Sequence, residues 1–177
     1  MYKINIKQLS MAGLMAALVL VGTMLIQVPT PTKGYIHIGD SMVYLSGIIL
    51  GPVIGSFAAA IGSMLADLFS GYAIYAPATF VIKGLNAFVV GYIYHKIITE
   101  NASIIKKIIT FGVAVLFGGT IMVLGYLAYE SMLYGFGTAV LGIIGNITQA
   151  IGGGILAMPL MLALDRVSFS KYRNENK

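Results

Sequence analysis

The chain has 177 residues, of which 58% are hydrophobic and only 10% are charged, and its mean hydropathy is +0.91. A soluble domain of this size would have too few polar residues to cover its surface, so the composition indicates a protein embedded in a lipid bilayer. The net charge of +5 comes from short basic clusters at the ends of apolar stretches, which argues against a nucleic-acid partner. The absence of cysteine excludes disulfides and thiol nucleophiles.

Five apolar stretches approach or exceed the roughly 20 residues that a helix needs to cross the hydrocarbon of a bilayer. They are residues 9–27, 52–70, 77–96, 104–129 and 138–164. The first follows two lysines as a signal peptide would, but no small-residue cleavage pattern follows Ile26, so we expect it to remain as a helix. We expect one transmembrane domain over residues 1–177.

A sixth stretch, residues 40–50, is too short to cross, because eleven residues at about 1.5 Å each cover roughly half of the hydrocarbon. It is either the first part of one long helix over 40–70, kinked at Gly51 and Pro52, or a short helix that turns back into the next. The basic residues favour the second alternative. Nine of the eleven lie at the two termini and around the 96–107 connection, and all three clusters can be cytoplasmic only if the number of crossings is even.

A half-length second helix places part of the preceding segment, residues 28–39, below the membrane surface. Non-helical backbone at that depth is tolerated only where it lines a cavity or is buried in protein. The sequence therefore predicts an outward-facing cavity floored by residues 34–40. The alternative is an ordinary external loop, with a second helix that begins several residues earlier.

Ionisable residues away from the basic clusters all fall in the predicted outer half of the protein. They are Lys33, His37, Asp40, Asp67, Lys83 and Glu130. Such residues within a membrane usually pair with one another or serve a ligand. Asp67 and Lys83 fall at one depth of neighbouring helices, so they form either a structural ion pair or direct ligand contacts.

Polar residues also recur three or four positions apart, on one face of a helix: Lys83 with Asn86, Tyr126 with Glu130, and Asn146 with Gln149. Amides of this kind can simply link helices, but their shared depth favours a ligand site. Tyr35, Tyr72, Tyr75 and Tyr134 fall in the predicted outer connections, as an interfacial belt or as rings that hold a planar heterocycle. We expect substrate-binding residues at Tyr35, His37, Asp40, Asp67, Tyr75, Lys83, Asn86, Glu130, Asn146 and Gln149.

The motifs of common membrane enzymes are missing. There is no G-x-x-x-x-G-K-[ST] loop, no H-E-x-x-H and no G-x-S-x-G. We therefore expect no enzymatic activity, no cofactor and no metal site, and any ATP energy must come from another subunit. Small residues at Ala12 and Ala16, and again at 51, 55, 59 and 63, favour close helix packing within the chain or with a partner.

Together these features resemble the substrate-binding S component of energy-coupling factor (ECF) vitamin transporters. The resemblance rests on Ala12 and Ala16, the segments 29–31 and 34–40, the turn at 50–52, and the segment 71–77 that leads into Lys83 and Gly84. It implies six helices with both termini cytoplasmic, in the plasma membrane. It also implies that Ala12 and Ala16 contact a transmembrane coupling subunit which, with two cytoplasmic ATPases, makes the S component tip over and release its vitamin.

The segment 34–40 is most similar to family members for vitamin B6 or for the hydroxymethylpyrimidine part of thiamine. Two other functions remain open from the residues alone. One is a self-sufficient proton-coupled carrier that uses Asp67, Lys83 or Glu130. The other is a membrane scaffold whose small-residue faces are its whole function.

Overall fold

The computed structural model describes residues 6–30, 34–99 and 101–166, and these form an almost entirely helical molecule. The helices are α1 (Ile6–Leu25), α2 (Asp40–Leu50), α3 (Pro52–Phe69), α4 (Ala76–Ile97), α5 (Ile104–Tyr134), the four-residue α6 (Phe136–Ala139) and α7 (Gly142–Arg166). Two short antiparallel strands, β1 (Gln27–Pro29) and β2 (Tyr35–His37), lie between α1 and α2, with Val28 opposite Ile36. The predicted all-helical membrane fold is confirmed.

Five apolar helical stretches are long enough to cross a membrane: Ile6–Leu25, Pro52–Phe69, Ala76–Ile97, Ile104–Tyr134 and Phe136–Leu164. Each leaves large apolar side chains exposed, such as Leu9, Phe57, Leu85, Leu116 and Ile144. Exposed apolar surface on every long helix suits contact with lipid chains rather than with water.

The short second helix turns back, as the sequence predicts, instead of continuing into a kinked one. Gly51 ends α2 with a φ of 80°, a conformation that favours glycine, and Pro52 opens α3, where its missing N–H costs no hydrogen bond. The α3 backbone at Gly55 then packs against Ser46 and Gly47 of α2. The predicted small-residue face of α3 thus serves packing within the chain.

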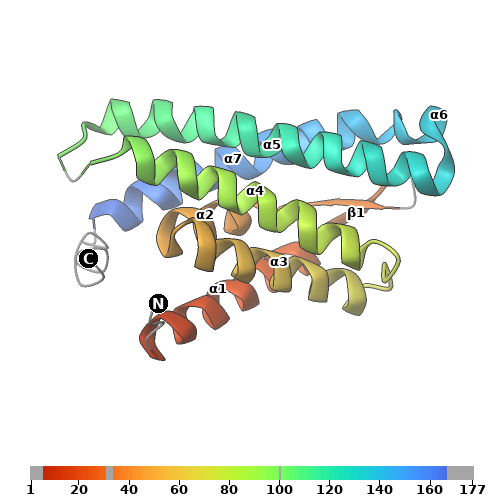
Figure 1. Cartoon of the computed structure of the whole chain (residues 1–177), viewed down its shortest axis with the longest axis horizontal. Coiled ribbons are helices and arrows are strands. Elements are labelled where there is room, and N and C mark those ends of the chain that lie inside the picture. Colours follow the sequence, from red (N-terminus) through yellow and green to blue (C-terminus); the bar gives the residue numbers. More distant parts are fainter. Residues whose placement is uncertain (1–5, 31–33, 100, 167–177) are drawn as a thin grey trace.

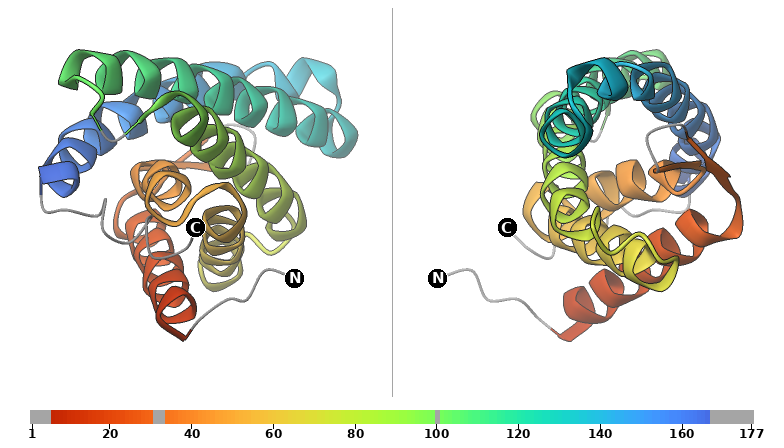
Figure 2. Two further views of the ribbon diagram at one scale, coloured as in Figure 1. Left: turned by 60° about the vertical axis from the view of Figure 1, so that its left-hand side comes forward. Right: turned by 90° about the vertical axis from the view of Figure 1, so that its right-hand side faces the viewer.

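The start of α1, the end of α7 and the α4–α5 connection lie at one end of the molecule, and the hairpin and α6 lie at the other (Figure 1). This arrangement agrees with an even number of crossings. Helix α2 packs against α1, α3, α4 and α7, so that these four helices surround it (Figure 2). Helices α2 and α4 approach each other closely at Gly47 and Gly91. Any side chain at Gly91 would be too near to α2, since its Cβ atom would lie 3.0 Å from the carbonyl carbon of Gly47.

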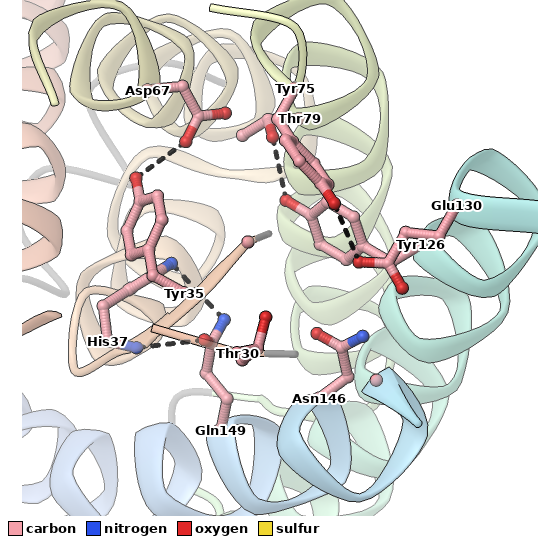
Figure 3. Close-up of a pocket in the computed structure, with 12 residues that line it drawn as sticks. Thr30, Tyr35, His37, Asp67, Tyr75, Thr79, Tyr126, Glu130, Asn146 and Gln149 are labelled. Carbon is pink, nitrogen blue, oxygen red and sulfur yellow. Dashed lines mark hydrogen bonds between the residues drawn. The ribbon is translucent and has the colours of Figure 1, made fainter. Parts of the chain in front are cut away.

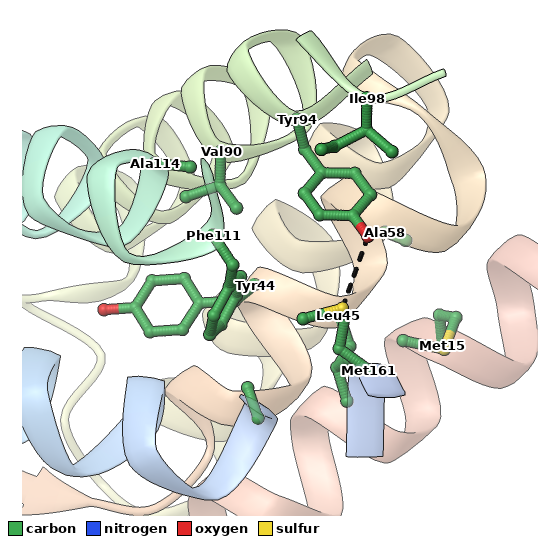
Figure 4. Packing of buried hydrophobic residues seen from close by; sticks show 11 residues of the cluster. Met15, Tyr44, Leu45, Ala58, Val90, Tyr94, Ile98, Phe111, Ala114 and Met161 are labelled. Atoms are coloured by element: carbon green, nitrogen blue, oxygen red, sulfur yellow. Dashed lines mark hydrogen bonds between the residues drawn. The ribbon is translucent and has the colours of Figure 1, made fainter. Parts of the chain in front are cut away.

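Apolar side chains fill the half of the molecule near the α4–α5 connection (Figure 4). Tyr44 packs edge-on against Phe111, with 6.4 Å between the ring centroids. The Tyr94 hydroxyl donates to the Met161 sulfur at 3.3 Å. The buried ionisable side chains His37, Asp67 and Glu130 lie in the opposite half.

Three of the predicted helices differ by more than one residue from the helices of the structure. Helix α1 covers 6–25 rather than 9–27, because Gln27 enters β1. Helix α5 continues five residues beyond 129 and ends at Tyr134, so the placement of Tyr134 in a connection was wrong. Gly135, with a φ of 83°, follows the last helical residue. The predicted helix over 138–164 is divided into α6 and α7, where Leu141 N–H bonds the Thr138 carbonyl and the chain turns more tightly than an α-helix.

Candidate ligand pocket

A pocket at the hairpin end of the molecule encloses about 430 Å³ of empty space, counting its open mouth. Side chains from the hairpin and from four helices point into it (Figure 3). The pocket is lined by Thr30, Gly34, Tyr35, His37, Asp67, Tyr75, Thr79, Tyr126, Glu130, Gly142, Asn146 and Gln149. Hydrogen-bonding side chains and tyrosine rings therefore dominate its wall.

Strand β2 supplies one side of the pocket. Because side chains alternate along a strand, Tyr35 and His37 point to the same face, while Ile36 packs toward Gly145 of α7. His37 is buried, and burial together with the charge of Lys83 lowers its pKa to about 3, although Asp40 acts in the opposite direction. The prediction that this non-helical segment lines a cavity is confirmed, and the side of the membrane on which the cavity opens stays a prediction.

Two buried carboxylates face the pocket, and each accepts a hydrogen bond from a tyrosine. Tyr35 Oη donates to Asp67 Oδ1 at 2.7 Å, and Tyr75 Oη donates to Glu130 Oε1 at 3.2 Å. Burial, followed by the neighbouring carboxylate, raises the pKa of both tyrosines well above the usual range, so both hydroxyls remain protonated donors. The pocket thus holds two acceptor groups on separate helices.

Aromatic rings surround these carboxylates. The ring centroids of Tyr35 and Tyr72 lie 4.5 Å apart, and those of Tyr75 and Tyr126 lie 6.4 Å apart. The Tyr126 hydroxyl is 2.9 Å from Thr79 Oγ1, which joins α5 to α4 across the pocket. The rings of Tyr35, Tyr75 and Tyr126 line the pocket, where an aromatic face can stack on a planar ligand.

Directly beneath the pocket lies a buried ion pair. Lys83 Nζ is 2.5 Å from Asp40 Oδ1, and neither side chain is exposed. Gln149 Nε2 donates to Asp40 Oδ2 at 2.7 Å, and Lys83 also lies 2.9 Å from the Met122 sulfur. The pair therefore ties α2 to α4, and Gln149 ties both to α7.

Seven of the ten side chains predicted to bind substrate line the pocket, namely Tyr35, His37, Asp67, Tyr75, Glu130, Asn146 and Gln149. The structure places Asp40, Lys83 and Asn86 below it, with no exposed surface. Of the two alternatives for Asp67 and Lys83, the ion pair is not formed, because Asp40 at the start of α2 reaches Lys83 instead. Lys33 lies outside the described residues.

Five lining residues were not among the ten predicted substrate-binding residues: Thr30, Gly34, Thr79, Tyr126 and Gly142. The sequence paired Tyr126 with Glu130 from its spacing but did not place it among those ten. A signal for Thr79 was present, since Tyr75, Thr79 and Lys83 recur every four residues and so share one helix face. Among the described residues, no three His, Asp or Glu side chains are placed to bind one metal ion.

Helix α1 is the least buried of the five long stretches. Ala12 and Ala16 are half-buried beside the apolar core, and the Ala16 carbonyl lies against Gly62 of α3. Gly13 and Ala17, one position further on, are exposed, and a Cβ atom at Gly13 would meet no other atom within 4 Å. The small residues of α1 thus continue from the packed side of the helix onto its open face.

Comparison with known proteins gives a match over nearly the whole chain. A family model described as the S component of ECF-type riboflavin transporters matches residues 3–166. An uncharacterized protein from Pyrococcus woesei is 39% identical over 139 residues, which are 78% of this chain and 88% of that protein. The thiamine precursor transporter HmpT of Lactococcus lactis subsp. cremoris is 27% identical over 168 residues, which are 92% of this chain and 90% of HmpT.

Proposed function

Because the chain belongs to the family of S components of ECF-type riboflavin transporters, we propose that its pocket captures a vitamin or vitamin precursor built on one heterocyclic ring, of the hydroxymethylpyrimidine or pyridoxine type. As a family member, the protein is a multi-pass membrane protein that serves vitamin uptake by binding substrate, and it is not an enzyme. Family membership favours this function over a self-sufficient carrier or a scaffold.

The size of the pocket supports a one-ring ligand. Its empty space is about 430 Å³ only when the open mouth is counted, so the enclosed part is smaller still. A pyrimidine or pyridine with short substituents suits this space better than the three fused rings and the sugar-alcohol chain of riboflavin. The similarity to HmpT, described as a thiamine precursor transporter, points in the same direction.

The observation that carries the proposal is the distribution of polar groups around the pocket. Asp67 and Glu130 can accept hydrogen bonds from an amino or hydroxyl substituent, while Asn146 presents an amide from α7. The tyrosine rings supply faces on which the heterocycle can stack. A planar ring with several small polar substituents matches both kinds of contact.

We propose further that a transmembrane coupling subunit and two cytoplasmic ATPases supply the energy of uptake. The low burial of α1 and its small residues support this helix as the docking element, since small side chains let a partner helix approach closely. Ala12 and Ala16 form the packed edge of this face, and Gly13 and Ala17 form its exposed part.

The experiment that tests the ligand is thermal unfolding of the full chain, purified in detergent, with hydroxymethylpyrimidine, pyridoxine, thiamine and riboflavin added separately. A ligand at 100 times its Kd adds about 2.7 kcal/mol to the free energy of unfolding, which raises the melting temperature measurably. Stabilisation by hydroxymethylpyrimidine or pyridoxine supports the proposal. Stabilisation by riboflavin alone contradicts the one-ring ligand. An unchanged melting temperature with all four compounds contradicts the whole ligand class.

A further inference from the structure

The side-chain amide of Gln149 has a fixed orientation at the pocket floor. Its Nε2 donates to Asp40 Oδ2 at 2.7 Å, and its Oε1 accepts the backbone N–H of His37 at 3.0 Å. The opposite orientation would place the amide oxygen against a carboxylate that Lys83 keeps charged, and the NH₂ group against another N–H. The NH₂ group therefore lies on the side of Asp40 and of the His37 ring.

The tautomer of His37 is fixed as well. The backbone N–H of Gly39 donates to His37 Nδ1 at 3.1 Å, so this nitrogen must carry a lone pair. The ring is neutral at physiological pH, because burial and the charge of Lys83 disfavour protonation. A neutral imidazole with an unprotonated Nδ1 carries its hydrogen on Nε2.

Two donors consequently face each other. His37 Nε2 lies 3.4 Å from Gln149 Nε2, and both nitrogens carry hydrogen, so this contact lacks an acceptor. Besides Asp40 and His37, the Gln149 NH₂ group lies 3.7 Å from the Met122 sulfur, which is a weak acceptor. Both side chains line the pocket and point toward one another at its edge (Figure 3), and a buried donor without an acceptor is costly.

We infer that the ligand supplies one oxygen atom that accepts hydrogen bonds from both His37 Nε2–H and Gln149 Nε2–H. A hydroxyl, hydroxymethyl or carbonyl oxygen has two lone pairs and can accept from both donors, whereas a pyridine-type ring nitrogen has one. The same donors repel an ammonium or amino group, which directs such substituents toward Asp67 and Glu130. This inference rests on the proposed function and adds the chemical group by which the pocket orients its ligand.

The tautomer can be tested without any ligand. The chain has two histidines, His37 and His95, so nitrogen-15 labelling of histidine gives two imidazole spectra, which a His95→Gln variant assigns. We expect the Nε2–H tautomer for His37 at neutral pH. A spectrum with hydrogen on Nδ1, or with a charged ring, overturns the inference and leaves vitamin capture untouched.

The ligand oxygen is tested by calorimetric titration with hydroxymethylpyrimidine and its analogue in which methyl replaces hydroxymethyl, and with pyridoxine and analogues that each lack one hydroxyl. We expect wild type to lose at least about tenfold in affinity when the bridging oxygen is removed, and His37→Phe to lose no more than about threefold. His37→Gln, which keeps a donor, and His95→Gln should behave more like wild type.

Equal losses of affinity in wild type and His37→Phe, or no loss in wild type, overturn the inference. Wild type that binds none of the parent compounds contradicts the proposed function itself.

Discussion

Lys83 on α4 donates to Asp40 on the first turn of α2 across 2.5 Å, and both side chains are completely buried. Two charges withdrawn from water lose several kcal/mol of hydration each, which their mutual attraction and further hydrogen bonds must offset. Here Gln149 supplies one such bond to Asp40, and the Tyr126 ring lies 5.6 Å from the ammonium. The pair fixes the relative position of three helices directly below the ligand pocket.

Replacing Lys83 with Met should destabilise the protein strongly. The variant leaves the Asp40 carboxylate buried without its cation, and such losses cost about 3–5 kcal/mol. Thermal unfolding of the detergent-purified chain measures the effect. The double variant Lys83→Met with Asp40→Asn is the control and should be more stable than the single variant, since no charge remains. A single variant as stable as wild type would refute the importance of the pair.

Tyr35→Phe should weaken ligand binding by about 1 kcal/mol, the typical value of one hydrogen bond. The variant removes the hydroxyl that donates to Asp67 but keeps the ring, so the carboxylate loses its orientation. Tyr72→Phe is the matched control, because the Tyr72 ring packs against the Tyr35 ring at a tilt of 44° and Tyr72 is not among the residues that line the pocket. Equal effects of the two variants in calorimetric titration would show that the hydroxyl of Tyr35 has no special role.

The structure separates two asparagines that the sequence treats alike. Asn146→Leu should lower ligand affinity by at least about 1 kcal/mol if the amide bonds the ligand, because Asn146 lines the pocket. Asn86→Leu should leave affinity within about twofold, because Asn86 is completely buried below the pocket. The reverse order of effects would place the ligand one turn deeper than the pocket described above.

The depressed pKa of His37 predicts loss of stability in acid. Above its ordinary value of 6.5 the ring is neutral in both states, but between 6.5 and about 3 only the unfolded chain gains the proton. The folded state should therefore lose about 2 kcal/mol by pH 5 through this residue. Melting temperatures across this range should fall less steeply for His37→Gln, whereas His95→Gln should follow wild type. Parallel curves for wild type and His37→Gln would contradict the buried neutral ring.

Gly13→Leu should reduce ATP-driven uptake in cells that contain the coupling subunit and ATPases, and leave ligand affinity unchanged. The added side chain has open space within the chain but would obstruct a partner helix on α1. Gly112→Leu on α5 is the matched control, since Gly112 is also exposed with no neighbour within 4 Å. Ala16 is less suitable for this test, because its backbone already packs on Gly62. Equal uptake by the two variants would show that the coupling subunit does not dock on this face of α1.

Much of the fold follows from features that act locally. Hydrophobic stretches give the long helices, and the Gly51–Pro52 pair gives the turn between α2 and α3, because positive φ and a missing N–H have local causes. The depth of a residue along its helix also predicts correctly that Asp67, Glu130 and Gln149 reach one pocket. The last inference needs only the position of each residue along its helix.

Rotation about the helix axes and the depth of α2 could not be obtained in this way. Asp67 and Lys83 share a depth, but Lys83 points toward α2, whose first residue supplies the nearer carboxylate. The close contact of Gly47 with Gly91 sets α2 against α4, and it depends on tertiary packing rather than on sequence spacing. The orientation of the Gln149 amide at the pocket floor likewise depends on partners more than 100 residues away in the chain.

The closed floor of the pocket also limits the routes by which a bound molecule can leave. A passage through the opposite end of the protein would have to separate Lys83 from Asp40 and then part the apolar layer around Tyr44 and Phe111. Isolating those two charges in a dry interior costs several kcal/mol per ion. A bound molecule therefore meets a costly barrier on the side of the pocket opposite its mouth.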